Sequence, residues 1–233
     1  YFMTGIYEDG TYLENNPSWH QEDSPWKAKQ IEKILQRNAL TPASICEVGC
    51  GAGEILNRLS SGKLGDSQFT GYEISPQAYE ICSAKTKSNL KFEFVNLLEQ
   101  NSAYFDLVLA IDVFEHIEDF YGFLRALKIK GEYKIFHIPL DLSVQSVLRS
   151  SPIIKERETV GHIHYFMKET ALASLEDCGY EIVDYFYTPG SIELPNRGVL
   201  ANLFKIPRSI SFALHKDLAV RILGGYSLMV LAK

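Results

Sequence analysis

A short glycine-rich segment that follows an apolar run constrains the fold of this chain more than any other feature. The segment reads Glu47-Val48-Gly49-Cys50-Gly51-Ala52-Gly53-Glu54, and the apolar run covers residues 44–48. Residues 54–59 have a helix-like pattern. Glycine lacks a Cβ and tolerates positive φ, so a strand, a glycine turn and a helix together bring backbone N–H groups close to a ligand. The sequence therefore predicts a ligand site between a buried strand and a helix.

An acidic residue at the end of the next apolar run indicates the kind of ligand. Glu73 ends the run 69–73 and lies twenty residues beyond Gly53. A carboxylate at this point can accept hydrogen bonds from both hydroxyls of a ribose. A dinucleotide-binding turn has the spacing G-x-G-x-x-G, whereas this turn has G-x-G-x-G and places Glu54 where the third glycine would stand. The pattern predicts a nucleoside cofactor and counts against a dinucleotide oxidoreductase.

Runs of strand length alternate with helix-like segments along the chain. The predicted strands are 44–48, 69–73, 90–95, 105–111, 132–138, 181–187 and 227–232, and the predicted helices are 26–37, 54–59, 76–85, 114–127 and 168–178. This alternation predicts an α/β fold, a doubly wound Rossmann-like sheet with helices on both faces. Ligands of such sheets bind at the carboxyl ends of the strands, where Glu73, Asn96 and Asp112 fall.

Two segments lie outside this alternation, and we treat residues 24–233 as the main domain. Residues 1–23 are rich in aromatic and polar side chains, which is typical of a flap over a binding site or of an arm packed on the surface. The connection 189–225 precedes the last strand, and we expect Pro207 to divide it into two helices. Between 196 and 224 it carries five Lys or Arg residues against one acid. It could form a lid, a homodimer interface or a contact with a membrane surface, and we favour the lid.

Composition excludes several classes of protein. No apolar run approaches the 18 residues of a membrane span, and the chain does not open with a basic and then apolar leader. The formal net charge of −6 argues against a nucleic-acid binder. The cysteines have no zinc-like spacing and suggest buried thiols in a reducing cytosol: Cys46, Cys50, Cys82 and Cys178. We therefore expect a cytoplasmic protein that does not act on nucleic acid.

Two further motifs follow the fourth and fifth predicted strands. One contains Asp112, Glu115 and His116 in a D-x-x-E-H pattern, and the other reads Gly161-His162-Ile163-His164-Tyr165-Phe166. Together with the glycine turn and Glu73, these motifs resemble those of class I S-adenosylmethionine-dependent methyltransferases, in particular the enzymes that act on small molecules. The resemblance covers roughly residues 40–187.

The resemblance implies S-adenosylmethionine as cofactor and a seven-stranded sheet whose last strand is antiparallel. Glu73 would hold the ribose, Ile74 would pack on the adenine, and the glycine turn would surround the methionine part. Asn96 stands where many relatives have an aspartate, near the adenine amino group. The residues expected at the cofactor are Glu47, Gly49, Cys50, Gly51, Gly53, Glu73, Ile74, Asn96, Leu97 and Asp112.

Methyl transfer from a sulfonium needs in-line positioning and, for some acceptors, removal of a proton. His116 is the first candidate for the base, because an unperturbed imidazole titrates near neutral pH. His162 and His164 are second candidates, and each of the three could instead hold the backbone in place. We expect methylation of a small-molecule acceptor at oxygen, with nitrogen and carbon acceptors left open.

Two alternatives use the same residues. A non-catalytic protein that binds S-adenosylmethionine or S-adenosylhomocysteine, as a sensor or partner subunit, would keep the glycine turn and Glu73, but the retained Glu115 and His116 favour an enzyme. Asp112, Glu115, His116 and a later histidine also resemble the divalent-metal site of RNA 3′-terminal 2′-O-methyltransferases, and such ligands suit a metal. The negative charge disfavours RNA, so we expect no metal.

Overall fold

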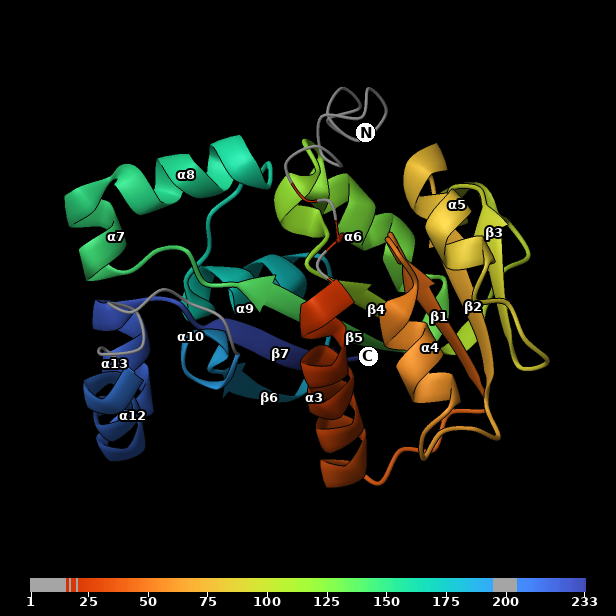
Figure 1. The fold of residues 1–233 in the computed structure, drawn as a ribbon, viewed down its shortest axis with the longest axis horizontal. Helices are drawn as coiled ribbons and strands as arrows, with labels where there is room; N and C mark the ends of the chain where they lie inside the picture. Colours follow the sequence, from red (N-terminus) through yellow and green to blue (C-terminus); the bar gives the residue numbers. More distant parts are fainter. Residues whose placement is uncertain (1–15, 17, 20, 195–204) are drawn as a thin grey trace.

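The computed structural model describes residues 16, 18–19, 21–194 and 205–233, and seven strands of this part form one sheet (Figure 1). The strand order is β3-β2-β1-β4-β5-β7-β6, and β7 runs antiparallel to both of its neighbours. The strands are β1 (Ser44–Val48), β2 (Gln68–Glu73), β3 (Leu90–Phe94), β4 (Phe105–Ile111), β5 (Gly131–Pro139), β6 (Ile182–Thr188) and β7 (Ser227–Ala232). The predicted fold, including its antiparallel last strand, is confirmed.

Helices cover both faces of the sheet because alternate residues of each strand point to opposite sides. On β1, for example, Ile45 packs with residues of α3, α4 and α5, whereas Cys46 packs with residues of α6 and α9. The helices are α3 (Ser24–Arg37), α4 (Glu54–Ser60), α5 (Pro76–Ser83), α6 (Phe120–Lys128), α7 (Val144–Arg149), α8 (Ser151–Thr159), α9 (Lys168–Asp177), α10 (Gly190–Glu193), α12 (Lys205–Leu214) and α13 (Lys216–Leu223), with short 3-10 turns η1 (Gln21–Asp23), η2 (Leu97–Glu99) and η3 (Phe114–His116).

Two helical predictions need correction. The predicted helix 114–127 is divided into η3 and α6, because Asp119 accepts a hydrogen bond from the N–H of Gly122 at 2.8 Å and starts a new helix there. Pro207 does not divide the segment before β7, since it lies in the first turn of α12, where its missing N–H has no partner within the helix. The break comes instead at His215, whose ring accepts from the N–H of Leu218.

The order of the strands fixes where a ligand can bind. From β1 the chain builds outward through β2 and β3 on one side, and β4 and β5 continue on the other. The order therefore reverses between β1 and β4, which is the usual position of a ligand crevice in such sheets. The glycine turn follows β1 at this point, and Asp112 follows β4 beside it.

Candidate active site

A cavity of about 1310 Å³ lies at the carboxyl ends of the central strands. Its lining has two parts, which we call the glycine-loop half and the helical half. The glycine-loop half comprises the lining residues between 19 and 74, between 95 and 97 and between 111 and 113. The helical half comprises those between 139 and 162 and between 190 and 227, and His116 and His137 complete the lining.

The last glycine of the glycine turn lies so close to its neighbours that there is no room for a side chain. Gly53 has a φ of +72°, and a Cβ there would lie 2.6 Å from the ring of Phe92 and 2.8 Å from the Cβ of Cys82. Gly49 and Gly51 also have positive φ. The turn consequently forms a wall of bare backbone on one side of the cavity.

Glu73 is held in one orientation by backbone groups. Its Oε2 accepts from the N–H of Gly51 at 2.7 Å, and its Oε1 accepts from those of Ile74 and Ser75 at 2.8 Å. The side chain is buried, and this burial raises the pKa of Glu73 although the three N–H groups oppose the rise. The carboxylate thereby joins the glycine turn to the end of β2.

Glu47 presents a buried carboxylate with an unused oxygen. Its Oε2 has no hydrogen-bond partner in the part of the chain that the structure describes, and the residue is 2% exposed. Burial raises the pKa of Glu47 well above its usual value, while nearby Lys27 lowers it. A buried oxygen without a partner is costly, so a cationic or hydrogen-bonding ligand group in the cavity would be stabilised there.

Asp112 lines the cavity and interacts with two basic side chains, those of Lys27 and His137. It has a φ of +54°, which is strained for a residue other than glycine, and such strain is concentrated at functional sites. Its carboxylate lies 2.7 Å from Nζ of Lys27 and 2.6 Å from Nδ1 of His137. Burial alone would raise the pKa of Asp112, but His137 and Lys27 hold it well below its usual range. The charge of this aspartate is therefore fixed and neutralised within the protein.

Two histidines meet where the two halves join. Nδ1 of His116 lies 3.0 Å from the carbonyl oxygen of Gly161, which can only accept, so Nδ1 carries the proton and Nε2 of the neutral ring carries a lone pair. Nδ1 of His162 lies 2.7 Å from Oδ2 of Asp141. The two rings meet edge to face with centroids 4.9 Å apart. Nε2 of His116 lies 3.8 Å from Oε1 of Glu115.

Glu115 lies beside these rings and is completely buried. Neither of its carboxylate oxygens has a hydrogen-bond partner among the described residues, and burial together with Asp112 raises the pKa of Glu115 to about 8. Burial would lower the pKa of His162, but the bond to Asp141 and the charge of Glu115 raise it to about 9. Glu115 contributes only where it is ionised, so the bond to Asp141 is what keeps His162 mainly cationic near neutral pH.

The same cluster could also hold a divalent cation. One ligand atom each from Glu115, His116 and His162 lies within 4.8 Å of the others. A carboxylate and two imidazoles form an acceptable ligand set for several transition metals. The expectation of no metal, made from the sequence, stays a prediction.

Every residue predicted at the cofactor lines the cavity, and so do His116 and His162. His164 does not, because Nε2 of its ring lies 2.9 Å from the carbonyl oxygen of Ile117 and the ring packs on Phe120 outside the lining. Lys27 and Asp141 also line the cavity and were not predicted from the sequence. Lys27 shares the helical spacing of the buried Ile31 and Ile34, which was a signal that it points inward.

Comparison with known proteins gives the class. Residues 18–185 match the family described as "Methyltransferase domain", and the chain belongs to this family. The family and the seven-stranded sheet together define the chain as a methyltransferase domain. Among the helices of the described residues, none is both long and apolar enough to cross a membrane.

Two curated relatives carry the name of a particular enzyme rather than of a domain. The chain is 27% identical over 141 residues to a ubiquinone biosynthesis O-methyltransferase of Colwellia psychrerythraea, with 57% of this chain and 56% of that protein covered. It is 34% identical over 86 residues to the ubiquinone biosynthesis O-methyltransferase of Methylocella silvestris, with 35% and 32% covered. The chain thus matches about half of the length of the first relative and a third of the second.

Solved structures share the fold at low identity. A putative sarcosine dimethylglycine methyltransferase from Galdieria sulphuraria has a TM-score of 0.61 at 15% identity, with 88% of this chain and 83% of that chain covered. The plantazolicin methyltransferase BpumL in complex with SAH has a TM-score of 0.58 at 17% identity, with 97% and 88% covered. At such identities the likeness shows the fold alone.

Proposed function

We propose that this enzyme methylates a hydroxyl oxygen of a small phenol-like molecule, with His116 as the base. The observation that carries the proposal is the hydrogen bond from Nδ1 of His116 to the carbonyl oxygen of Gly161, which fixes the tautomer of a ring that lines the cavity beside Glu115. The two curated relatives are named as O-methyltransferases of ubiquinone biosynthesis, which supports an oxygen acceptor.

The glycine-loop half fits the cofactor by the chemistry of its groups. Glu73 is already oriented at the end of β2 and would accept the ribose hydroxyls. The unused oxygen of Glu47 suits the ammonium of the methionine part, and Lys27 suits its carboxylate. Ile74 and Asn96 would border the adenine, since both line this half.

Bound S-adenosylmethionine supplies a methyl group that is already activated for transfer. Nε2 of His116 accepts the proton of the acceptor hydroxyl. The cationic His162, held by Asp141, stabilises the negative charge that develops on the acceptor oxygen. His164 orients its segment against the chain rather than acting on the acceptor.

Residues 1–15, 17 and 20 of the predicted flap lie outside the described residues, and Asn16 and Trp19 are the residues from which we infer that the segment closes the site. Trp19 lies against the glycine turn, 3.7 Å from the position of a Cβ on Gly51. The side chain of Asn16 donates to the carbonyl oxygen of Thr159 at the end of α8. One contact is with the glycine turn and the other with the end of α8, so the segment would exclude water from the reacting groups. Helices α10, α12 and α13 would act as the lid over the acceptor, and residues 195–204 of the predicted lid lie outside the described residues.

The test is methyl transfer to a panel of phenols and catechols. The reaction is measured as the rate at which S-adenosylhomocysteine is formed. His116→Ala should lower kcat about 100-fold, as expected for loss of a general base, and should leave the affinity for S-adenosylmethionine unchanged. His215→Ala, which removes a ring that caps α13 outside the cavity, is the matched control. Unchanged kcat in His116→Ala would refute the assignment of the base.

A cation at Glu115, His116 and His162 is a second candidate, favoured by the buried carboxylate of Glu115, whose oxygens accept no hydrogen bond from the described residues. Dialysis against EDTA distinguishes a cluster in which His116 is the base from one whose three residues bind a metal ion. With His116 as base, activity survives EDTA. If EDTA abolishes activity and a divalent salt restores it, these residues are metal ligands instead.

A further inference from the structure

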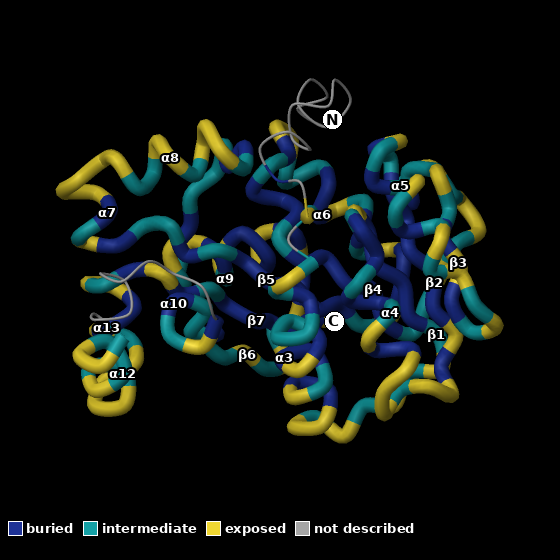
Figure 2. Tube along the Cα trace, in the orientation of Figure 1, coloured by how far each residue is buried: buried dark blue, intermediate teal, exposed yellow. Residues whose placement is uncertain are grey.

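Four helices at one end of the molecule carry most of the exposed aliphatic surface. These are α7, α8, α12 and α13, which we call the helical end (Figure 1). A side-chain hydrogen bond from Gln145 of α7 to the carbonyl oxygen of Leu223 of α13 joins the two helix pairs. Of the fifteen exposed large hydrophobic side chains among the described residues, nine lie here: Val144, Val147, Leu148, Ile154, Ile206, Ile210, Leu214, Leu218 and Ile222. Figure 2 shows long exposed stretches on these helices, in contrast to the buried strands.

The exposed aliphatic side chains form stripes that face away from the protein. On α12, Ile206, Ile210 and Leu214 follow one another at intervals of four residues and are 69%, 55% and 82% exposed. The other side of α12 points inward, where Arg208 donates to the carbonyl oxygen of Gly224 at 2.8 Å. A surface helix of a globular protein normally has the reverse arrangement, with its apolar stripe on the core.

Two other helices of this end also expose aliphatic side chains. On α7, Leu148 is 80% exposed while Ser146 is buried. On α13, Leu218 and Ile222 are exposed at an interval of four residues, while Ala219 and Val220 on the opposite side are buried. Exposed aliphatic side chains on neighbouring helices indicate an apolar partner that is not among the described residues.

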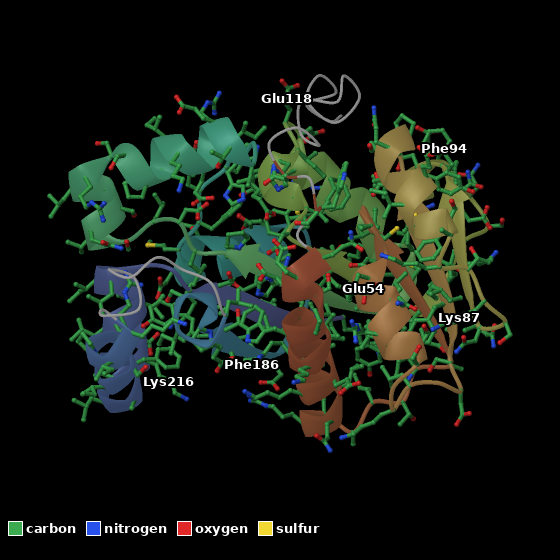
Figure 3. All side chains as sticks on the ribbon, in the orientation of Figure 1. Glu54, Lys87, Phe94, Glu118, Phe186 and Lys216 are labelled. Atoms are coloured by element: carbon green, nitrogen blue, oxygen red, sulfur yellow. The ribbon has the colours of Figure 1, made fainter. Side chains whose placement is uncertain are left out.

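The charge of the helical end identifies that partner. Its helices carry seven Lys or Arg residues against three Asp or Glu residues, although the whole chain has a net charge of −6. Lys216, labelled in Figure 3, lies on this end, far from Glu54 of the glycine turn. Aliphatic stripes bordered by basic side chains suit the interface of a membrane with anionic lipids. A second copy of this end would instead bring like charges together, which disfavours a symmetric dimer.

We propose that the helical end docks on the surface of a membrane that contains anionic lipids and takes the acceptor from it. The inner sides of the same helices line the cavity, with Arg149, Ile153 and Lys155 from α7 and α8 and Ser211 and Leu223 from α12 and α13. An acceptor with an apolar chain would therefore reach the cavity without crossing water. Docking itself does not depend on the proposed function, whereas delivery of the acceptor rests on it.

The experiment is flotation of the protein with vesicles of phosphatidylcholine, with and without phosphatidylglycerol. We expect binding to the anionic vesicles that weakens with added salt. Leu148→Ser/Leu214→Ser should weaken it at least tenfold, because two aliphatic side chains lose their burial in lipid. Tyr104→Ser/Ile129→Ser, which alters side chains that are 62% and 72% exposed outside the helical end, is the matched control and should bind as the unaltered protein does. Arg157→Glu/Lys216→Glu should weaken binding to anionic vesicles and leave the weak binding to phosphatidylcholine unchanged.

Three outcomes would overturn the proposal: no binding of the unaltered protein to anionic vesicles, equal loss in the control variant, or full binding by Leu148→Ser/Leu214→Ser. Sedimentation velocity without vesicles tests the alternative that a second copy of the chain covers the helical end. A dimer that Leu148→Ser/Leu214→Ser dissolves would assign the surface to self-association. Methyl transfer to a water-soluble phenol, measured in parallel, separates failure of docking from failure of the proposed chemistry.

Discussion

The two halves of the cavity are built in different ways. In the glycine-loop half the backbone itself forms the wall, and the carboxylate of Glu73 is held by three main-chain N–H groups. In the helical half the wall consists of side chains from helices whose aliphatic stripes face outward. The first half tolerates almost no change of shape, whereas the second depends on a few polar contacts. A cofactor shared by many enzymes suits a rigid site, and an acceptor specific to one enzyme suits a wall that changes by substitution of side chains.

Among the variants that test this comparison, Gly53→Ala should cause the largest change, a loss of stability. A non-glycine residue at φ of +72° costs about 1–2 kcal/mol, and overpacking against Phe92 adds about 1–3 kcal/mol. We expect the free energy of unfolding in urea to fall by about 3 kcal/mol. Gly190→Ala is the control, since a Cβ there would meet its neighbours at 3.5 Å or more. A Gly53→Ala protein as stable as the control would show that the glycine turn is not rigid.

Glu73→Gln should have the next largest effect, measured on the binding of the cofactor. The amide keeps the size of the side chain but replaces one of its two acceptor oxygens with a donor group. Affinity for S-adenosylmethionine, measured by calorimetry, should fall about 10- to 100-fold, or about 1.4–2.8 kcal/mol. Glu93→Gln, on the exposed part of β3, should bind normally. Equal affinities in the two variants would remove Glu73 from the cofactor site.

The pH dependence of stability should report on Glu115 and His162. Both groups bind protons more tightly in the folded state, since the pKa of Glu115 rises from 4.5 to about 8 and that of His162 rises from 6.5 to about 9. Stability from Glu115 is therefore lost as pH rises from 4.5 to 8, and stability from His162 is lost between 6.5 and 9. The free energy of unfolding should fall most steeply between pH 6.5 and 8.

Glu115→Gln should remove the part of this fall that lies below pH 6.5, which exceeds about 1.4 kcal/mol, the equivalent of one pKa unit. Urea unfolding at a series of pH values measures it. Glu118→Gln, an exposed neighbour labelled in Figure 3, is the control and should keep the full slope. An identical slope in Glu115→Gln would mean that Glu115 is ionised throughout.

The smallest effect is expected at the helical end. Leu148→Ser/Leu214→Ser alters side chains that are 80% and 82% exposed, so the free energy of unfolding without vesicles should change by about 0.5 kcal/mol or less. Leu56→Ala, on α4 beside the glycine turn, should lower it by about 3 kcal/mol because Leu56 is fully buried. If the double variant were as destabilised as Leu56→Ala, the exposed stripes would be part of the core.

The sequence predicted best what depends on local backbone chemistry. The glycine turn, the strand ends and Glu73 could be located because glycine spacing and apolar runs describe the backbone directly. The pairs Lys27–Asp112 and Asp141–His162 could not be found, because each joins residues from separate elements and no spacing encodes the distance. Helices α7 and α8 were not predicted either, since their apolar residues face outward and do not continue the pattern of the core.

The position of β7 has a consequence for how the chain acquires its structure. β6 forms its ladder with β7, which is made later and inserts between β6 and β5. During synthesis the strand 182–188 therefore waits without its partner until residues 227–232 have left the ribosome. Until then β5 also keeps an open edge, and both strands could pair with another chain. In that interval most of the residues that line the cavity have been synthesised, but the sheet beneath them is not closed.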